Sequence, residues 1–287
     1  MFKICKNQLL HSLSSPRLYV ALLLGISAQI IALIPLLNLS EAVKSPINIW
    51  EPFVYFNCDD YIAATALLGV FLLVSDIPFT EISETYSLIR ISRVKWLYGK
   101  TIYIIFMCVV YYVVIAISGM VFIIGNACIS SNWSLPIHML TQDTSLIIAN
   151  RYTTFFLYPE ITSSLLPIHA YFYSIILSAA YACICCLFLF LLNMFFSRSI
   201  SFFLTIFLHI AGYTLSTIGV AKFLSPFSLF GNSLLMYHSF DGYSPKSAYL
   251  SIRQSLLVYF ILTIVILKVL KWKLTVFDFK ILGVDQR

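Results

Sequence analysis

Six long apolar runs constrain this chain more than any other feature of its sequence. They cover about residues 18–37, 61–79, 101–124, 169–195, 202–221 and 250–270. A helix needs about 20 mostly apolar residues to cross a bilayer, and it satisfies its own backbone groups there. The last run is flanked by Arg253 and Lys268, whose side chains can extend towards lipid headgroups. The sequence therefore predicts an all-α polytopic membrane bundle of six transmembrane helices.

The composition favours a membrane protein over a soluble enzyme. The 287 residues are 60% hydrophobic and only 10% charged, whereas a soluble domain carries about 25% charged residues. The net charge of +6 comes from Lys and Arg residues beside the apolar runs rather than from a solvated block. We therefore expect one transmembrane domain over residues 1–287, no nucleic-acid partner, and a first span that stays as an anchor because no cleavable signal peptide precedes it.

The distribution of Lys and Arg predicts the orientation. With the N-terminus inside, 13 of them fall on the cytoplasmic side and 5 outside, as the positive-inside rule requires. Both termini are then cytoplasmic, together with the loops 80–100 and 196–201. The outside segments are 38–60, the long extracellular loop 125–168, for which we expect a cap with short helices, and 222–249, which is too interrupted to span the bilayer.

Residues 1–17 predict a helix before the first span. Phe2, Cys5, Leu9 and Leu13 recur at helical spacing, and Pro16 ends the pattern. One interpretation is an amphipathic helix lying in the cytoplasmic interface. The other is a positively charged lead-in to a membrane anchor.

Residues 80–100 carry a pattern that a simple connecting loop does not need. Ile82, Tyr86 and Ile89 fall on one helical face, while acidic residues face elsewhere and basic residues follow. Such a helix at the cytoplasmic surface can dock in a groove of a partner protein. The alternative is an ordinary loop that obeys the positive-inside rule.

The run Thr-Tyr-Ser-Leu-Ile-Arg-Ile-Ser-Arg at 85–93, followed by Gly99 and Lys100, resembles the coupling-helix region of ABC transporter permeases of the type-2 exporter family. The likeness extends to six spans, an N-terminal interfacial helix and a broken apolar segment before the last span. The chain departs from the family in its short turn after the fourth span and its long loop after the third. These departures leave the subfamily and the cargo undefined.

The resemblance implies a separate ABC ATPase subunit that binds ATP and Mg, and a second permease chain in a homo- or heterodimer. It places the chain in the cell membrane, as a multi-pass protein of a bacterial plasma membrane. It also implies short re-entrant helices at about 224–240. The residues that would dock the ATPase are Glu81, Glu84, Tyr86, Ile89, Arg90 and Arg93.

The source of energy follows from two further sequence features. The chain lacks a G-x-x-x-x-G-K-[ST] phosphate loop, so it binds no nucleotide cofactor of this kind itself. The spans also contain few ionisable residues of the sort that ion-coupled carriers use. An external motor is therefore favoured over an ion gradient.

The fifth span carries small and hydroxyl residues together with one histidine. Thr205, His209, Tyr213 and Ser216 are among them. They could line the substrate pathway or a dimer seam, or simply allow close helix packing. His209 could relay a proton, or it could hydrogen-bond a neighbouring helix.

The seven cysteines predict neither a disulfide framework nor a metal site. Cys183, Cys185 and Cys186 lie in an apolar span, and only Cys183 and Cys186 share a helical face. A soft-metal site needs more ligands, so core packing is the better interpretation. Whether Cys58 and Cys128 form a bridge stays open.

A bundle of this kind can serve three classes of function. The first is the permease subunit of an ATP-driven exporter for a hydrophobic or amphipathic substrate such as a lipid, a peptide or a drug. The second, an intramembrane enzyme, needs a catalytic pair on inward helix faces, and the sequence offers none. The third is a non-transporting membrane protein, such as an immunity or assembly factor. We expect no enzymatic activity in this chain, since ATP hydrolysis belongs to the partner.

Overall fold

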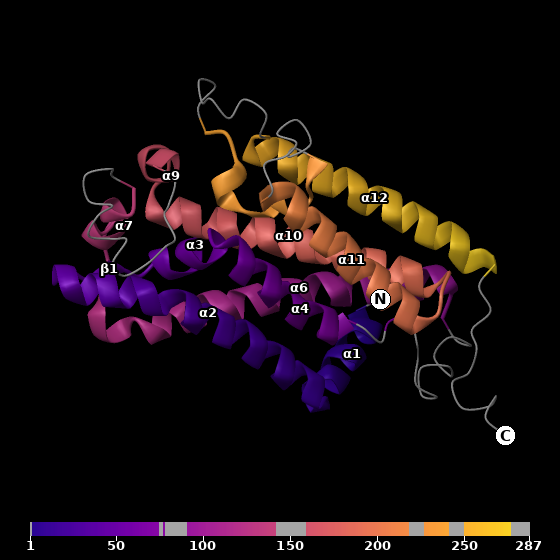
Figure 1. Cartoon of the computed structure of the whole chain (residues 1–287). Coiled ribbons are helices and arrows are strands. Elements are labelled where there is room, and N and C mark those ends of the chain that lie inside the picture. Colours follow the sequence, from indigo (N-terminus) through magenta and orange to yellow (C-terminus); the bar gives the residue numbers. More distant parts are fainter. Residues whose placement is uncertain are drawn as a thin grey trace.

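The computed structural model describes residues 2–74, 77, 91–141, 159–217, 227–240 and 250–276, and they form a helical bundle (Figure 1). The long helices are α2 (Pro16–Val43), α4 (Asp60–Val74), α6 (Arg93–Phe122), α10 (Pro167–Asn193), α11 (Arg198–Thr217) and α12 (Ile252–Val276). Shorter helices are α1 (Phe2–Ser14), α3 (Glu51–Asn57), α7 (Leu135–Met139) and α9 (Pro159–Ser164). The rest are 3₁₀ turns η1 (Ile124–Asn126), η4 (Gly231–Ser233) and η5 (Leu235–Tyr237), and a parallel bridge of β1 (Ile47–Asn48) with β2 (Ala127–Cys128).

Five described helices are long and apolar enough to cross a membrane, and a sixth span is possible if α3 and α4 count as one broken span bent by 95°. This agrees with the all-α, multi-pass membrane architecture that the sequence predicts. Several boundaries differ from the predicted ones. The helix α2 continues to Val43, α3 occupies part of the predicted outer loop 38–60, and α6 begins at Arg93 rather than at residue 101.

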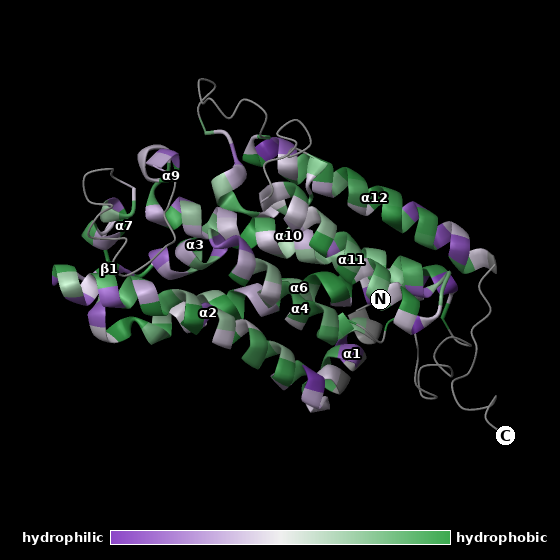
Figure 2. Ribbon diagram, in the orientation of Figure 1, coloured by the Kyte–Doolittle hydropathy of each residue, from purple (hydrophilic) through white to green (hydrophobic). Residues whose placement is uncertain are grey.

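The core sits around α10, which runs through the middle of the bundle in Figure 1. In the apolar stretch of α10, 72% of the residues are buried inside the bundle, whereas the corresponding share is 22% in α11 and 22% in α12. Large apolar side chains such as Phe203, Phe207 and Phe260 are exposed instead. Figure 2 shows hydrophobic residues along the flanks of the bundle and hydrophilic ones mostly near its ends. A water-facing surface would not carry this pattern, whereas a lipid-facing one does.

Two glycines let α2, α4 and α6 approach closely. The hydroxyl of Tyr111 on α6 donates a 2.6 Å hydrogen bond to the backbone oxygen of Ala66 on α4. A Cβ at Gly25 or Gly69 would overlap the Tyr111 hydroxyl. Small residues therefore open a notch into which this tyrosine inserts.

The segment predicted as interfacial is helical over α1. It ends at Ser14, and α2 begins with Pro16, a residue that suits the first turn of a helix because it lacks an N–H. The helix α1 packs against α6, with Cys5 buried and with Leu10 and Leu13 exposed. An apolar, outward-facing surface on a short helix before the first span is what an interfacial position requires.

One end of the bundle, here called the cap end, carries β1, β2, α7 and α9 (Figure 1). The side-chain amide of Asn48 donates to the backbone oxygens of Ser130 and Asn132 at 2.7 and 2.9 Å. The indole of Trp133 donates to the Leu165 oxygen at 2.8 Å. Described parts of the predicted extracellular loop 125–168 thus form an ordered cap with short helices.

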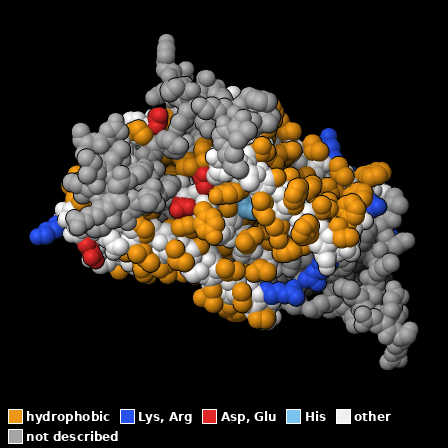
Figure 3. Space-filling view, viewed as in Figure 1, with side chains coloured by type: hydrophobic (Ala, Val, Ile, Leu, Met, Phe, Trp, Pro, Cys, Tyr) orange, Lys and Arg blue, Asp and Glu red, His pale blue; other side chains and the backbone are white. Residues whose placement is uncertain are grey.

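Acidic and basic residues lie towards opposite ends of the bundle. The five acidic residues within the described ranges belong to α2, α3, α4 and α9 or to the turn before α4. On the face in Figure 3, acidic side chains lie towards the cap end and most basic ones lie at the opposite end, here called the basic end. The acids are Glu41, Glu51, Asp59, Asp60 and Glu160. The basic end carries Lys6, Arg17, Arg93, Lys95, Lys100, Arg198, Lys268, Lys271 and Lys273, while Lys44 and Arg253 lie towards the cap.

Candidate functional site

The first candidate region is the basic end, where α6 begins. Of the predicted docking residues, Glu81, Glu84, Tyr86, Ile89 and Arg90 lie outside the described residues. Arg93 is the first residue of α6.

The guanidinium of Arg93 joins α6 to α12. Its Nη1 donates to the backbone oxygens of Leu274 and Thr275 in the last turn of α12, at 3.1 and 3.4 Å. The last carbonyls of a helix have no partner within the helix and carry partial negative charge. The contact therefore fastens the first turn of α6 to the last turn of α12.

Aromatic and basic side chains extend this junction. Trp96 is buried on α6 and packs edge-on against Phe190 of α10, with ring centroids 6.0 Å apart. The Lys100 ammonium lies 5.6 Å from the Trp96 ring, and that of Lys273 lies 4.5 Å from the ring of Phe195. These cation–π contacts let basic side chains pack at the end of an apolar bundle. The basic end is thus a built junction of α6, α10 and α12.

The second candidate region is the elbow, the bend at residues 57–60 between α3 and α4. The Ser178 hydroxyl on α10 donates to Asn57 Oδ1 at 2.8 Å, and Asn57 Nδ2 donates to the Ser233 oxygen at 3.5 Å. The Tyr237 hydroxyl donates to Asp60 Oδ2 at 2.6 Å. The elbow therefore meets α10 and the segment 228–238 through side-chain hydrogen bonds, at a place where helix breaks leave backbone groups to be satisfied.

His209 ties α11 to this region. Its Nε2 lies 3.1 Å from the Ala64 oxygen and its Nδ1 lies 3.0 Å from the Tyr181 hydroxyl. Because a carbonyl can only accept, Nε2 carries the proton and Nδ1 accepts from Tyr181. The ring packs edge-on against Phe71 and Phe230. Of the two interpretations of His209, the structure favours hydrogen bonds to neighbouring helices.

The other three residues proposed for a pathway or dimer seam on α11 also face the chain itself. Thr205 is buried and donates to the Ser201 oxygen within its own helix. Tyr213 packs on Phe230 with centroids 5.9 Å apart. A Cβ added at Gly231 would lie only 3.1 Å from the Cβ of Ser216, so the Ser216 side chain packs against Gly231. A seam with a second chain would have to use the opposite face of α11, where Phe203, Phe207, Leu208 and Ile210 are exposed.

Sequence reasoning missed four residues of the elbow region: Asn57, Asp60, Ser178 and Tyr237. It assigned the first two to a water-exposed loop. A signal was present in Phe53, Val54 and Phe56, which are apolar in the middle of that loop and are buried in the structure.

The cysteines behave as packing residues. All seven are free, and Cys183, Cys185 and Cys186 are buried, as core packing predicts. The sulfurs of Cys108 and Cys186 are 4.0 Å apart. Among the described residues no group of three or more candidate ligands could hold a metal ion. Cys58 and Cys128 are unbridged in this structure.

His238 gives the segment beside the elbow a pH-dependent stability. Its Nδ1 donates to the Leu234 oxygen at 3.0 Å, and its Nε2 accepts from the Ser255 hydroxyl at 3.1 Å. Burial lowers the pKa of this imidazole from 6.5 to about 4. Below about pH 6.5 the unfolded chain thus binds a proton that the folded chain excludes, so the free energy of unfolding falls as the pH decreases towards 4.

We expect the protein to lose about 2 kcal/mol of stability through His238 between about pH 7.5 and about pH 5. The thermal midpoint in detergent measures this at both pH values. His238→Gln should show a smaller loss, while His169→Gln, which changes an exposed histidine of α10, should behave as the unmodified protein does. An equal pH dependence in all three would refute the assignment.

Comparisons with known proteins add no relative to this picture. No family model matches the chain, and searches of curated proteins and of solved structures found no match either.

Proposed function

We propose that the chain is the transmembrane permease subunit of an ATP-driven exporter of the ABC type. A separate ATPase subunit binds ATP and Mg and supplies the energy, and a second permease chain, identical or different, completes the pathway. The cargo is a hydrophobic or amphipathic substrate such as a lipid, a peptide or a drug. The chain lies in the cell membrane of a bacterium with both termini in the cytoplasm.

The observation that carries this proposal is the junction of α6 with α12. The segment expected to dock the ATPase leads directly into α6, and Arg93 in the first turn of α6 holds the last turn of α12. A force applied to that segment would act on two long helices at once. Coupling of this kind needs a rigid link between the docking point and the spans.

The charge distribution supports the proposed orientation. Nine Lys and Arg residues whose side chains the structure describes lie at the basic end, and two lie towards the cap. The positive-inside rule then places the basic end in the cytoplasm. The cap, with its ordered short helices, lies outside.

A charge reversal in the docking segment tests the proposal. Arg90→Glu is expected to reduce the amount of co-purifying ATPase by about tenfold or more, because it reverses a charge within the proposed contact. Lys271→Glu, an exposed residue of α12 at the same end, is the matched control and should retain the ATPase.

Both variants should insert into the membrane in normal amounts. If no ATPase accompanies the unmodified protein from its native membrane, or if Arg90→Glu retains it fully, the exporter assignment is wrong.

One observation favours the alternative of a non-transporting protein, such as an immunity or assembly factor. Every residue of α3 is buried in the cap half of the bundle, so a passage through α3 would require this helix to move. Capture of a membrane or secreted partner without an ATPase would support that alternative.

A further inference from the structure

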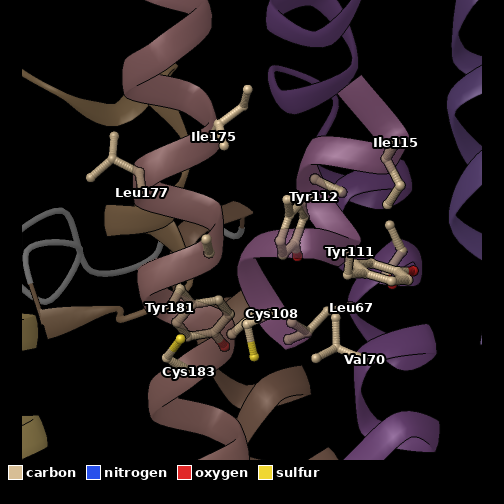
Figure 4. Close-up of a cluster of buried hydrophobic side chains, with 14 of the residues drawn as sticks. Leu67, Val70, Cys108, Tyr111, Tyr112, Ile115, Ile175, Leu177, Tyr181 and Cys183 are labelled. Atoms are coloured by element: carbon tan, nitrogen blue, oxygen red, sulfur yellow. The ribbon is translucent and has the colours of Figure 1, made fainter. Parts of the chain in front are cut away.

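A small internal cavity lies beside the elbow. It is lined by α3 and α4 at Phe56, Asn57, Ala63 and Leu67, by α6 and α10 at Tyr112, Ser178 and Tyr181, and by Phe230, Ser233 and Leu234. Figure 4 shows Tyr112 and Tyr181 lying between α6 and α10. The cavity has room for about one water molecule, and an apolar cavity of this size would stay empty.

The lining has unused hydrogen-bonding capacity. The Tyr112 side chain is buried, and its hydroxyl has no partner among the described residues. The Tyr181 hydroxyl donates its hydrogen to His209 Nδ1 and can still accept another hydrogen bond. The Ser178 hydroxyl can also accept, and Asn57 keeps one amide hydrogen beyond its long contact with Ser233. A buried hydroxyl without a partner is unfavourable by about 1–3 kcal/mol, so these groups call for a bridging molecule.

The backbone beside the cavity also leaves N–H groups without a partner within the helix. The helix α4 starts at Asp60, and the N–H groups of Asp60 and Tyr61 find no acceptor within the described part of the chain. Helix starts leave such groups free, and in a membrane only protein or water can satisfy them.

We propose that this cavity binds an ordered water molecule between Tyr112, Asn57, Ser178 and Tyr181, and that it forms the pivot of a hinge between α3 and α4. Water can exchange hydrogen-bond partners as the bend changes, whereas a packed side chain resists such movement. The hinge lets α3 move against α10. This inference concerns the bundle alone and holds whether or not the chain binds an ATPase.

Two neighbouring tyrosines test the water site. Tyr111→Phe removes a hydroxyl with a visible acceptor, the Ala66 oxygen, and is expected to lower the thermal midpoint by about 3 °C. Tyr112→Phe should lower it by a similar amount if the hydroxyl binds water. If the cavity is dry, Tyr112→Phe removes an unpaired polar group and the midpoint rises, which would overturn the proposal.

Filling the cavity tests the hinge. Ala63→Cys adds one heavy atom at the cavity, whereas Ala64→Cys changes the next residue of α4, which does not line it. Hydrogen exchange of the full chain in lipid nanodiscs, read over residues 57–62, should slow by about tenfold in Ala63→Cys and stay unchanged in Ala64→Cys. Equal exchange in both variants overturns the hinge, and Tyr112→Phe decides the water site even if Ala63→Cys fails to fold.

Discussion

Replacing Glu51 by alanine is expected to destabilise the protein by about 3–5 kcal/mol, the largest effect of any single substitution considered for this fold. Glu51 is fully buried at the start of α3. Its carboxylate accepts hydrogen bonds from the Ser134 N–H and the Ser134 hydroxyl, both at 2.6 Å, and from the Asn48 N–H at 3.0 Å. Alanine would leave all three donors buried without an acceptor.

The same carboxylate holds the cap onto the bundle, because Ser134 precedes α7 and Asn48 belongs to the β1–β2 bridge. The loss should therefore appear both as a decrease of the thermal midpoint in detergent, by about 10 °C, and as faster proteolysis of the cap. Ser134→Ala removes one hydrogen bond and should give about a third of the effect. Glu41→Ala, at an exposed acid of α2, should have none.

A Glu51→Ala protein within about 1 kcal/mol of the unmodified one would mean that water reaches the freed donors. The cap would then be held by other contacts.

Hydropathy predicts most of this architecture because a membrane helix is specified locally, by its own run of apolar residues. The runs at 169–195 and 202–221 correspond closely to α10 and α11. The elbow could not be predicted in this way. Polar residues at 57–60 look like the edge of a span, and only contacts with Ser178 on α10 and with the segment 228–238 show that α3 belongs inside the bundle.

The start of α6 illustrates a second limit of local patterns. Lys100 in the sequence suggests a boundary, yet the helix continues on both sides of it, and the Lys100 ammonium lies 5.6 Å from the ring of Trp96. Whether Arg93 binds a partner or the end of α12 depends on residues 181 positions away in the chain. The sequence shows Thr205 and His209 in one apolar span, but it does not tell which helices these two side chains meet.

Gly69→Ala is expected to destabilise the bundle by about 2–3 kcal/mol through overpacking. A Cβ at this position would overlap the Tyr111 hydroxyl and lie 2.9 Å from the Ala21 backbone oxygen of α2. The tyrosine can move, but the α2 backbone cannot without shifting the whole helix. Alanine improves intrinsic helix propensity by about 1 kcal/mol, so a net loss measures the steric clash itself.

Thermal unfolding of four proteins isolates the contact: the unmodified chain, Gly69→Ala, Tyr111→Phe and the double variant. Removing the hydroxyl in the Gly69→Ala background should recover about 1 kcal/mol, although Tyr111→Phe alone destabilises by breaking its bond to Ala66. Gly125→Ala is the control, because a Cβ there meets nothing within 4 Å. If Gly69→Ala is as stable as Gly125→Ala, the three helices do not meet at this notch, and the packing that positions α4 beneath the elbow must be different.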